Sequence, residues 1–302
     1  MNKDDLTILQ LINKNISMEE IARKLNITEK QLYIKIKKII NYGYRVDTKY
    51  SYDGSIYYQL NSSDDKRFEI RMDKEQNTFK CLVISDLHIG SIASNIKLVD
   101  IVYNYAIKNG IHIILNCGDF IEGDYTTTEK SILNIHDQLE YLIRKYPYDK
   151  SINNFFILGN HDNYLFKSNG LNIAKTIHNS RYDIIPIGIG SSNIKIKNDE
   201  MILFHQLHKD FKPIINQQKI LLSGHSHLMK TKIRDIFWLS IPTLSYKSND
   251  KTVDVIPGFV ELTIDFENNK FEYVEAKHMI INPKVIQVSE TRGKVKNLFN
   301  KK

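Results

Sequence analysis

Seven side chains of the kinds that bind divalent cations stand at the ends of short apolar runs in the sequence. They are Asp86, His88, Asp119, Asn160, His205, His225 and His227. Carboxylate and imidazole groups suit manganese, iron and zinc, and neither of the two cysteines belongs to the set. A carboxylate such as Asp119 can bridge two cations about 3.5 Å apart, as two-metal hydrolases require. The set therefore predicts a dinuclear hydrolytic site.

The apolar runs before these residues predict the strands of an α/β fold, for example residues 83–85 before Asp86. Because strand ends in a packed sheet gather along one edge, the seven side chains are expected to converge there. Glycine precedes three of the clusters and lets the chain turn sharply beside a ligand. In an extended backbone, the i, i+2 pairs Asp86/His88 and His225/His227 would each point two side chains the same way.

The order of these residues carries a family resemblance. Asp-x-His, Gly-Asp, Gly-Asn-His-Asp, a single His and Gly-His-x-His follow one another between Asp86 and His227. This order resembles the calcineurin-like metallophosphoesterase superfamily. The resemblance implies a four-layer α/β sandwich, in which two packed sheets are flanked by helices, over residues 78–283. It also implies a metal-dependent phosphoesterase.

The resemblance distributes the ligands over two metal ions that share one carboxylate. The first ion would be held by Asp86, His88, Asp119 and His227, and the second by Asp119, Asn160, His205 and His225. Mn²⁺ is the expected metal, with Fe and Zn as alternatives. Two such ions lower the pKa of a bridging water, so that hydroxide attacks phosphorus in line without a covalent phosphoenzyme.

Two further residues and one ambiguity complete the predicted site. The resemblance implies that His161 binds no metal but protonates the leaving oxygen, with Asp162 orienting its ring. Relatives usually place Gly or Pro after the histidine of the fourth motif, whereas Gln206 follows His205 here. His208 is therefore an alternative ligand, and we favour His205 because it ends a predicted strand.

Residues 1–60 predict a separate module of three helices and a hairpin. Ser17 and Thr28 each begin a capping box, and Asp53-Gly54 joins two β-type runs. The pattern resembles a winged helix-turn-helix module, whose third helix and ribbon would contact nucleic acid. The side chains expected to make these contacts are Lys30, Tyr33, Lys37, Lys38, Arg45 and Lys49. The alternative is a small helical module for protein contacts or dimerisation.

Composition predicts a linker and a tail, and it indicates the partner and the compartment of the protein. Residues 61–77 are polar and predict a linker, and residues 284–302 are basic and predict a mobile tail. The net charge of +7 and the pI of about 9.0 favour a polyanionic partner, here nucleic acid. No apolar run could cross a bilayer, no signal-peptide pattern begins the chain, and two cysteines fit a reducing compartment. We therefore expect a cytoplasmic protein with no membrane partner, and a homo-oligomer is compatible with the sequence.

Three functions from different classes fit this site. The first is a nucleic-acid phosphodiesterase or nuclease, because Glu122-Gly123 after Asp119-Phe120 is similar to the repair nucleases of the superfamily. The second is a phosphoesterase of small molecules, such as cyclic nucleotides or dinucleoside polyphosphates, or of phosphoproteins, with a module that regulates or dimerises. The third is a nucleic-acid-binding regulator with a vestigial site, which is disfavoured because all seven ligands are retained.

Overall fold

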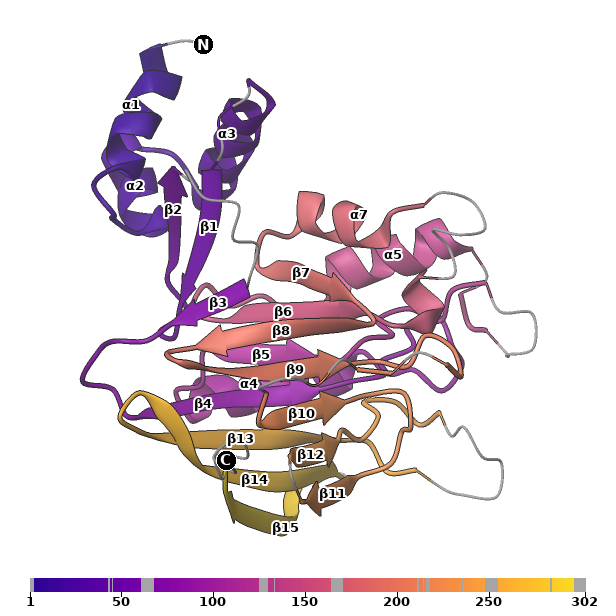
Figure 1. The fold of residues 1–302 in the computed structure, drawn as a ribbon. Coiled ribbons are helices and arrows are strands. Elements are labelled where there is room, and N and C mark those ends of the chain that lie inside the picture. The colour runs from indigo at the N-terminus through magenta and orange to yellow at the C-terminus, as the bar shows by residue number, and fades with distance from the viewer. Residues whose placement is uncertain are drawn as a thin grey trace.

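The computed structural model describes residues 3–42, 44, 46–60, 68–124, 130–132, 134–163, 171–210, 212–213, 215, 218–234, 236–247, 255–282 and 284–295. These residues form a sandwich of two mixed sheets with helices on its outside and a helical module at one end (Figure 1). The expected α/β sandwich of packed sheets flanked by helices is confirmed.

The first half of the sandwich contains the strands that the strongest apolar runs predict. β4 (Thr78–Ile84), β5 (Ile113–Asn116), β6 (Asn153–Leu158) and β7 (Ile184–Ile189) are parallel neighbours. β13 (Gly258–Glu267), β14 (Lys270–Ile281) and β15 (Val285–Lys294) extend this half from β4 in antiparallel pairs. Every residue of β5 and β6 is buried, because central parallel strands are covered on both faces.

The second half begins where the chain reverses after β7. A single residue pair, Ile189 with Ser191, joins β7 to β8 (Ser191–Ile196). β9 (Asp199–Phe204), β10 (Ile220–Ser223) and β12 (Phe237–Ser240) run parallel to one another, with β8 and β11 (Lys230–Ile233) antiparallel on either side. The two halves pack face to face through buried side chains such as Val83, Phe155 and Leu222.

Three helices cover the outer face of the first half. They are α4 (Lys97–Lys108), α5 (Ile135–Lys145) and α7 (Ile173–Ser180). Each has an apolar stripe: α4, for example, buries Leu98, Val102 and Ala106 at i, i+4 and i+8. These side chains belong to the same apolar cluster as Phe156 of β6. Among the helices in the described part of the chain, none is long and apolar enough to cross a bilayer.

The amino-terminal module has the predicted order of elements. α1 (Lys3–Ile12), α2 (Met18–Leu25) and α3 (Glu29–Asn41) precede the antiparallel hairpin of β1 (Val46–Ser51) and β2 (Ile56–Leu60). Oγ1 of Thr28 accepts from the amide of Gln31 at 3.1 Å, and Oε1 of Gln31 accepts from the amide of Thr28 at 2.8 Å. This is the expected capping box of α3. That the module belongs to the winged-helix class remains a prediction.

Two boundaries predicted from composition are wrong. Within the expected linker, β3 (Phe68–Arg71) pairs in parallel with both β1 and β8, while residues 61–67 lie outside the described part. Within the expected tail, residues 285–294 form β15, and residues 296–302 lie outside the described part. β15 keeps most of its side chains in solvent and is held by backbone pairing with β14, so its composition resembles that of a tail.

The module is docked on the sandwich. Tyr50 of β1 is buried in the sandwich core, with its ring centroid 4.8 Å from that of Phe155 in β6. The carbonyl oxygen of Gly54 accepts from Nδ2 of Asn153 at 2.6 Å. Because Asn153 begins β6 whereas Asn160 follows its end, this contact lies at the end of the sheet opposite the predicted ligands.

Candidate metal centre

The seven predicted ligands converge at the carboxyl ends of the strands, in two groups. In one group, Nε2 of His205 lies 3.1 Å from Oδ2 of Asp119 and 3.0 Å from Oδ1 of Asn160. Nδ1 of His225 lies 3.0 Å from the same oxygen of Asn160. Ligand atoms of Asp119, His205 and His225 all lie within 4.8 Å of one another, which is close enough for one cation.

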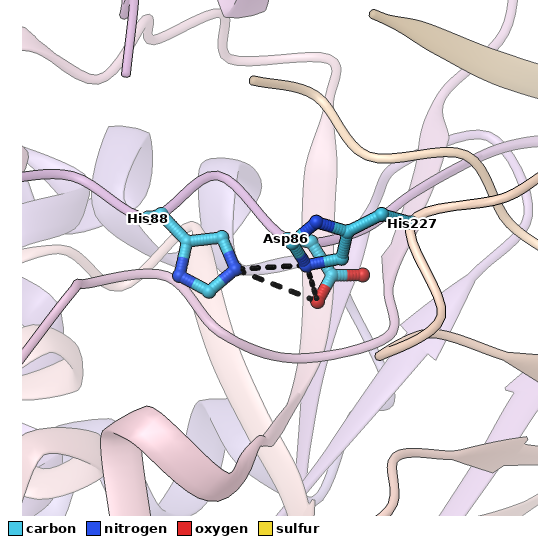
Figure 2. A group of neighbouring side chains, drawn as sticks. All are labelled: Asp86, His88 and His227. Carbon is cyan, nitrogen blue, oxygen red and sulfur yellow. Dashed lines mark hydrogen bonds and ion pairs between the residues drawn. The ribbon is translucent and has the colours of Figure 1, made fainter. Parts of the chain in front are cut away.

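The second group contains Asp86, His88 and His227 (Figure 2). Nε2 of His88 lies 3.1 Å from Nε2 of His227, and the two nitrogens lie 3.8 and 3.3 Å from Oδ1 of Asp86. Oδ2 of Asp119 lies 3.9 Å from Nε2 of His88, so this one oxygen faces both groups. The structure therefore brings all seven residues together, in the two groups that the resemblance implied.

Three of the imidazoles are held by an acceptor on the side away from the cluster. Nδ1 of His205 lies 2.7 Å from a backbone carbonyl oxygen, and Nδ1 of His227 lies 2.7 Å from that of Lys247. Nδ1 of His88 lies 3.0 Å from Oε2 of Glu122. A proton on each Nδ1 leaves a lone pair on Nε2 that points into the cluster. With the proton on Nδ1, Nε2 of His88 and Nε2 of His227, 3.1 Å apart, would both offer a lone pair to a cation between them.

Five of the seven residues have left-handed backbone conformations. Asp86, His88, Asp119, His225 and His227 have φ between +48° and +72°. Such values are uncommon for residues other than glycine and are concentrated at functional sites. The expected extended backbone at the i, i+2 pairs is therefore wrong. The side chains converge because the chain turns at each ligand.

The glycines before the clusters provide space as well as a turn. A Cβ on Gly159 would lie 2.1 Å from Oδ1 of Asp119, and a Cβ on Gly118 would lie 2.8 Å from Nδ1 of His205. A Cβ on Gly224 would lie 2.9 Å from the same nitrogen. Of the three, Gly118 alone has a positive φ, of +107°. The turn explains Gly118, whereas the other two glycines let neighbouring loops approach the ligands closely.

The buried carboxyl groups of Asp86 and Asp119 are ionised and therefore attract cations to the cluster. Burial alone would raise the pKa of Asp86 and Asp119, but the imidazoles of His227 and His205 outweigh it and hold both pKa values below normal. Burial alone would lower the pKa of His205, but the charge of Asp119 raises it to about 9. Oδ1 of Asp86 is buried and accepts no hydrogen bond from the described residues. Ionised oxygens beside imidazole nitrogens are a donor set for divalent cations, so the residues fit two such ions.

His161 lies beside the cluster, but Asp162 does not orient its ring as predicted. Nδ1 of His161 lies 2.7 Å from the carbonyl oxygen of Glu122, and its amide donates to Oδ1 of Asp119 at 2.9 Å. The carboxyl of Asp162 accepts instead from three backbone amides of the second and third motif loops, at 3.0 to 3.2 Å. Burial and then the charge of Asp119 raise the pKa of Asp162 to about 7 despite these donors. Asp162 therefore ties two ligand-bearing loops together.

Glu122 and Lys247 belong to the site but had no role in the sequence-based prediction. Both carboxylate oxygens of the fully buried Glu122 accept from Nζ of Lys247 at 2.8 Å, and Oε2 faces the ring of His88. The sequence marked Glu122 only through the similarity of Glu122-Gly123 to nucleases. Lys247 follows no strand or motif, and only the fold shows that it reaches the cluster.

The side chains expected to bind nucleic acid do not form one outward face. The hydroxyl of Tyr33 donates to the carbonyl oxygen of His178 at 2.9 Å, and the two rings pack edge to face. Nζ of Lys37 donates to Oδ1 of Asn179. The predicted exposure of Tyr33 is therefore wrong, because this side of α3 packs against α7, and Lys37 is half-buried there.

The other side chains expected to bind nucleic acid differ in their exposure. Lys30 and Lys38 are exposed, and Nζ of Lys38 lies 4.0 Å from a carboxylate oxygen of Asp5. Lys49 is partly buried in β1, and Arg45 lies outside the described residues. At the fourth motif, His208 is exposed, so the structure places His205 rather than His208 in the cluster.

The family model of the calcineurin-like phosphoesterases matches residues 79–277, well over half of the chain. The chain therefore belongs to the calcineurin-like phosphoesterase family and is a metal-dependent phosphoester hydrolase with candidate ligands for a dinuclear divalent metal centre. The curated proteins compared with it by sequence include no match.

Several solved structures resemble the chain at low identity. A phosphoesterase from E. coli, Yfce, is 16% identical over 72% of this chain and 100% of its own, with a TM-score of 0.45. Vacuolar Protein Sorting 29 from Cryptosporidium parvum is 14% identical over the same shares, also with a TM-score of 0.45. Nuclease MPE from Pseudomonas putida is 12% identical over 72% of this chain and 96% of its own, with a TM-score of 0.34. Similarities at this level carry no information about substrate.

Proposed function

We propose that the chain hydrolyses phosphodiester bonds in nucleic acid with two divalent metal ions, with Mn²⁺ as the working metal. The observation that supports this most directly is the position of Oδ2 of Asp119, which faces both His88 and His205. Oδ1 of the same carboxylate accepts from the amide of His161. Asp119 would therefore be a ligand that the two ions share.

The two ligand sets follow from the two groups of side chains. One ion would be held by Asp86, His88, Asp119 and His227, and the other by Asp119, Asn160, His205 and His225. When bound, such ions activate water as a nucleophile and neutralise phosphate oxygens. The protein holds the imidazoles in place through Glu122 and backbone carbonyl oxygens, which fixes the tautomer of each ring.

His161 would act on the leaving group. Its Nδ1 is 2.7 Å from the carbonyl oxygen of Glu122, so a proton on this nitrogen is held by the backbone. Nε2 is then the atom that would give a proton to the leaving oxygen. The side chain is 13% exposed, which leaves it accessible to a substrate from the rim of the cluster.

The choice of nucleic acid rests on charge. A net charge of +7 and a pI of about 9.0 favour a polyanionic substrate. Both cysteines are buried free thiols, which agrees with the cytoplasmic setting that we propose. A second candidate is a small-molecule or phosphoprotein phosphoesterase whose module regulates or dimerises. The engagement of Tyr33 and Lys37 with α7 favours this second candidate, because it removes part of the expected nucleic-acid face.

The test compares substrates with Mn²⁺ as the metal. Single-stranded DNA, plasmid DNA, a cyclic nucleotide and bis(p-nitrophenyl) phosphate are incubated with the wild-type chain and with Asp119→Asn. We expect the wild type to degrade DNA and to hydrolyse the chromogenic diester, and the variant to do neither. Hydrolysis of the small esters without any cleavage of DNA would favour the second candidate.

A further inference from the structure

We propose that β11 and the neighbouring Trp238 form a binding track for single-stranded polynucleotide beside the metal centre. This track consists of Lys230, Lys232, Arg234 and Trp238, and we call it the β11 strip. The inference rests on the proposed nucleic-acid function and specifies where such a substrate would lie.

The β11 strip begins at the metal edge, by which we mean the edge of the sheets where the seven candidate ligands lie. Lys230 comes three residues after His227 and pairs with Ser240 at the end of β12. Oγ of Ser240 lies 2.5 Å from Oγ of Ser226, which stands between His225 and His227. From Lys230 the strand runs antiparallel to β12, away from the carboxyl ends of the parallel strands. Figure 1 shows β11 and β12 side by side at the margin of the sandwich. A polymer bound there would lead directly to the ligands.

The cations of the strip are spaced along an exposed backbone. Lys230 and Lys232 are exposed, and as i, i+2 residues of a strand they share one face, about 6.6 Å apart. Arg234 is also exposed and follows the end of the strand. Within the described ranges none of the three belongs to an ion pair with a protein carboxylate. Their spacing along the strand suits successive phosphates of an extended polynucleotide.

Trp238 supplies an aromatic surface next to these cations. It is the cross-strand partner of Lys232, whose Nζ lies 4.7 Å from the centroid of the indole ring. Nε1 of Trp238 donates to Oγ of Ser223 at 2.7 Å, which fixes the ring, and the side chain is only partly buried. Aromatic rings beside basic side chains are the usual elements of single-strand binding, because every base can stack on them.

Lysines on an edge strand also have a simpler use, since they discourage pairing with another chain. That use accounts for Lys230 and Lys232. It does not require a tryptophan whose ring is anchored by Ser223 beneath one of the lysines, nor an arginine beyond the end of the strand. The combination with Trp238, next to the metal edge, favours binding.

Binding of a labelled oligonucleotide tests the strip directly. The Mn²⁺-loaded full chain is titrated against a phosphorothioate-linked oligodeoxythymidine, which resists hydrolysis, and fluorescence anisotropy is measured over a range of salt concentrations. The test variant is Lys230→Gln/Lys232→Gln/Arg234→Gln. The matched control is Lys108→Gln/Lys145→Gln/Lys270→Gln, which removes the same charge from exposed positions on α4, α5 and β14.

For three lost phosphate contacts, we expect the slope of log affinity against log salt to fall by about 2 in the strip variant and to be unchanged in the control. Trp238→Ala should weaken binding by about 5- to 150-fold, with partial rescue in Trp238→Phe because a ring is retained. If the strip variant and the control bind the oligonucleotide with the same affinity and the same salt dependence, the β11 strip is not a binding track.

Two further outcomes separate this proposal from the function on which it rests. If the wild type binds and cleaves DNA but the strip variant behaves like the control, only the strip is wrong. If the wild type hydrolyses bis(p-nitrophenyl) phosphate but neither binds nor cleaves polynucleotide, both the strip and the nucleic-acid function are wrong. Loss of affinity for duplex but not for single strands would overturn the single-strand assignment.

Discussion

The metal edge and the contact between α3 and α7 both bring together polar side chains from distant parts of the chain, but in opposite ways. At the metal edge groups of the same kind face one another: Nε2 of His88 lies 3.1 Å from Nε2 of His227. At the contact between α3 and α7 donors meet acceptors, as the hydroxyl of Tyr33 meets the carbonyl oxygen of His178. The first arrangement suits a cation, whereas the second is complete within the protein.

This difference separates binding residues from structural ones. A buried polar group without a partner and a left-handed residue other than glycine each cost free energy, about 1–3 kcal/mol. Such costs accumulate at Asp86, His88 and Asp119, where a ligand would offset them. Tyr33 and Lys37 show no such cost, and we conclude that they serve to dock the module.

The largest effect is expected from Asp119→Ala. Removal of the one oxygen that faces both groups should release both metal ions and lower kcat/KM for bis(p-nitrophenyl) phosphate by about 10³-fold or more. Metal content after gel filtration and the rate constant measure the two effects. Asp137→Ala, an exposed carboxylate on α5, is the control. A variant that still carried two ions would show that Asp119 does not bridge.

A smaller effect is expected from His161→Ala. Because this residue would donate a proton rather than bind metal, the variant should keep two metal ions and lose about 10²–10⁴-fold in kcat on DNA. The loss should be smaller with a nitrophenolate leaving group, which needs no protonation. Loss of metal comparable to that of Asp119→Ala would instead identify His161 as a ligand.

Glu122→Gln should have a moderate effect, because Glu122 acts through the ring of His88. Substitution of a residue that orients a ligand typically costs about 10- to 100-fold in metal affinity. Isothermal titration of the metal-free chain with Mn²⁺ measures it. Glu261→Gln is a matched control, since Glu261 is also a buried carboxylate near a lysine, Lys277 at 3.6 Å. Equal affinities in the two variants would mean that Glu122 only supports the fold.

The smallest expected effect is a pH dependence at the contact between α3 and α7. Burial, with a smaller contribution from the charge of Lys37, lowers the pKa of His178 to about 4. Between this pKa and the ordinary value near 6.5 the unfolded chain binds the proton and the folded chain does not, so stability falls as pH falls. Relative to His178→Asn, the wild type should lose about 1–2 kcal/mol of unfolding free energy between pH 7 and 5. Parallel pH profiles of the two proteins would show that His178 is not held neutral in the fold.

The ligand set could be predicted from the sequence because residue type, position and motif order all mark it. Asp86, His88 and His227 are ligand types that follow apolar strands, and the order of the motifs resembles that of a known family. The partners of Tyr33 could not be predicted from the sequence, because whether a helix face is exposed depends on what packs against it. Lys247 was missed for the same reason, since it reaches Glu122 only through the fold. β15 was missed because backbone pairing holds it rather than burial.

Anomalous diffraction from crystals grown with Mn²⁺ is the sharpest test of the dinuclear centre. We expect two peaks at the carboxyl ends of the strands. One should lie among Asp86, His88 and His227, the other among Asn160, His205 and His225, with Asp119 between them. A single peak, or a peak held by Glu122 and His161, would contradict it.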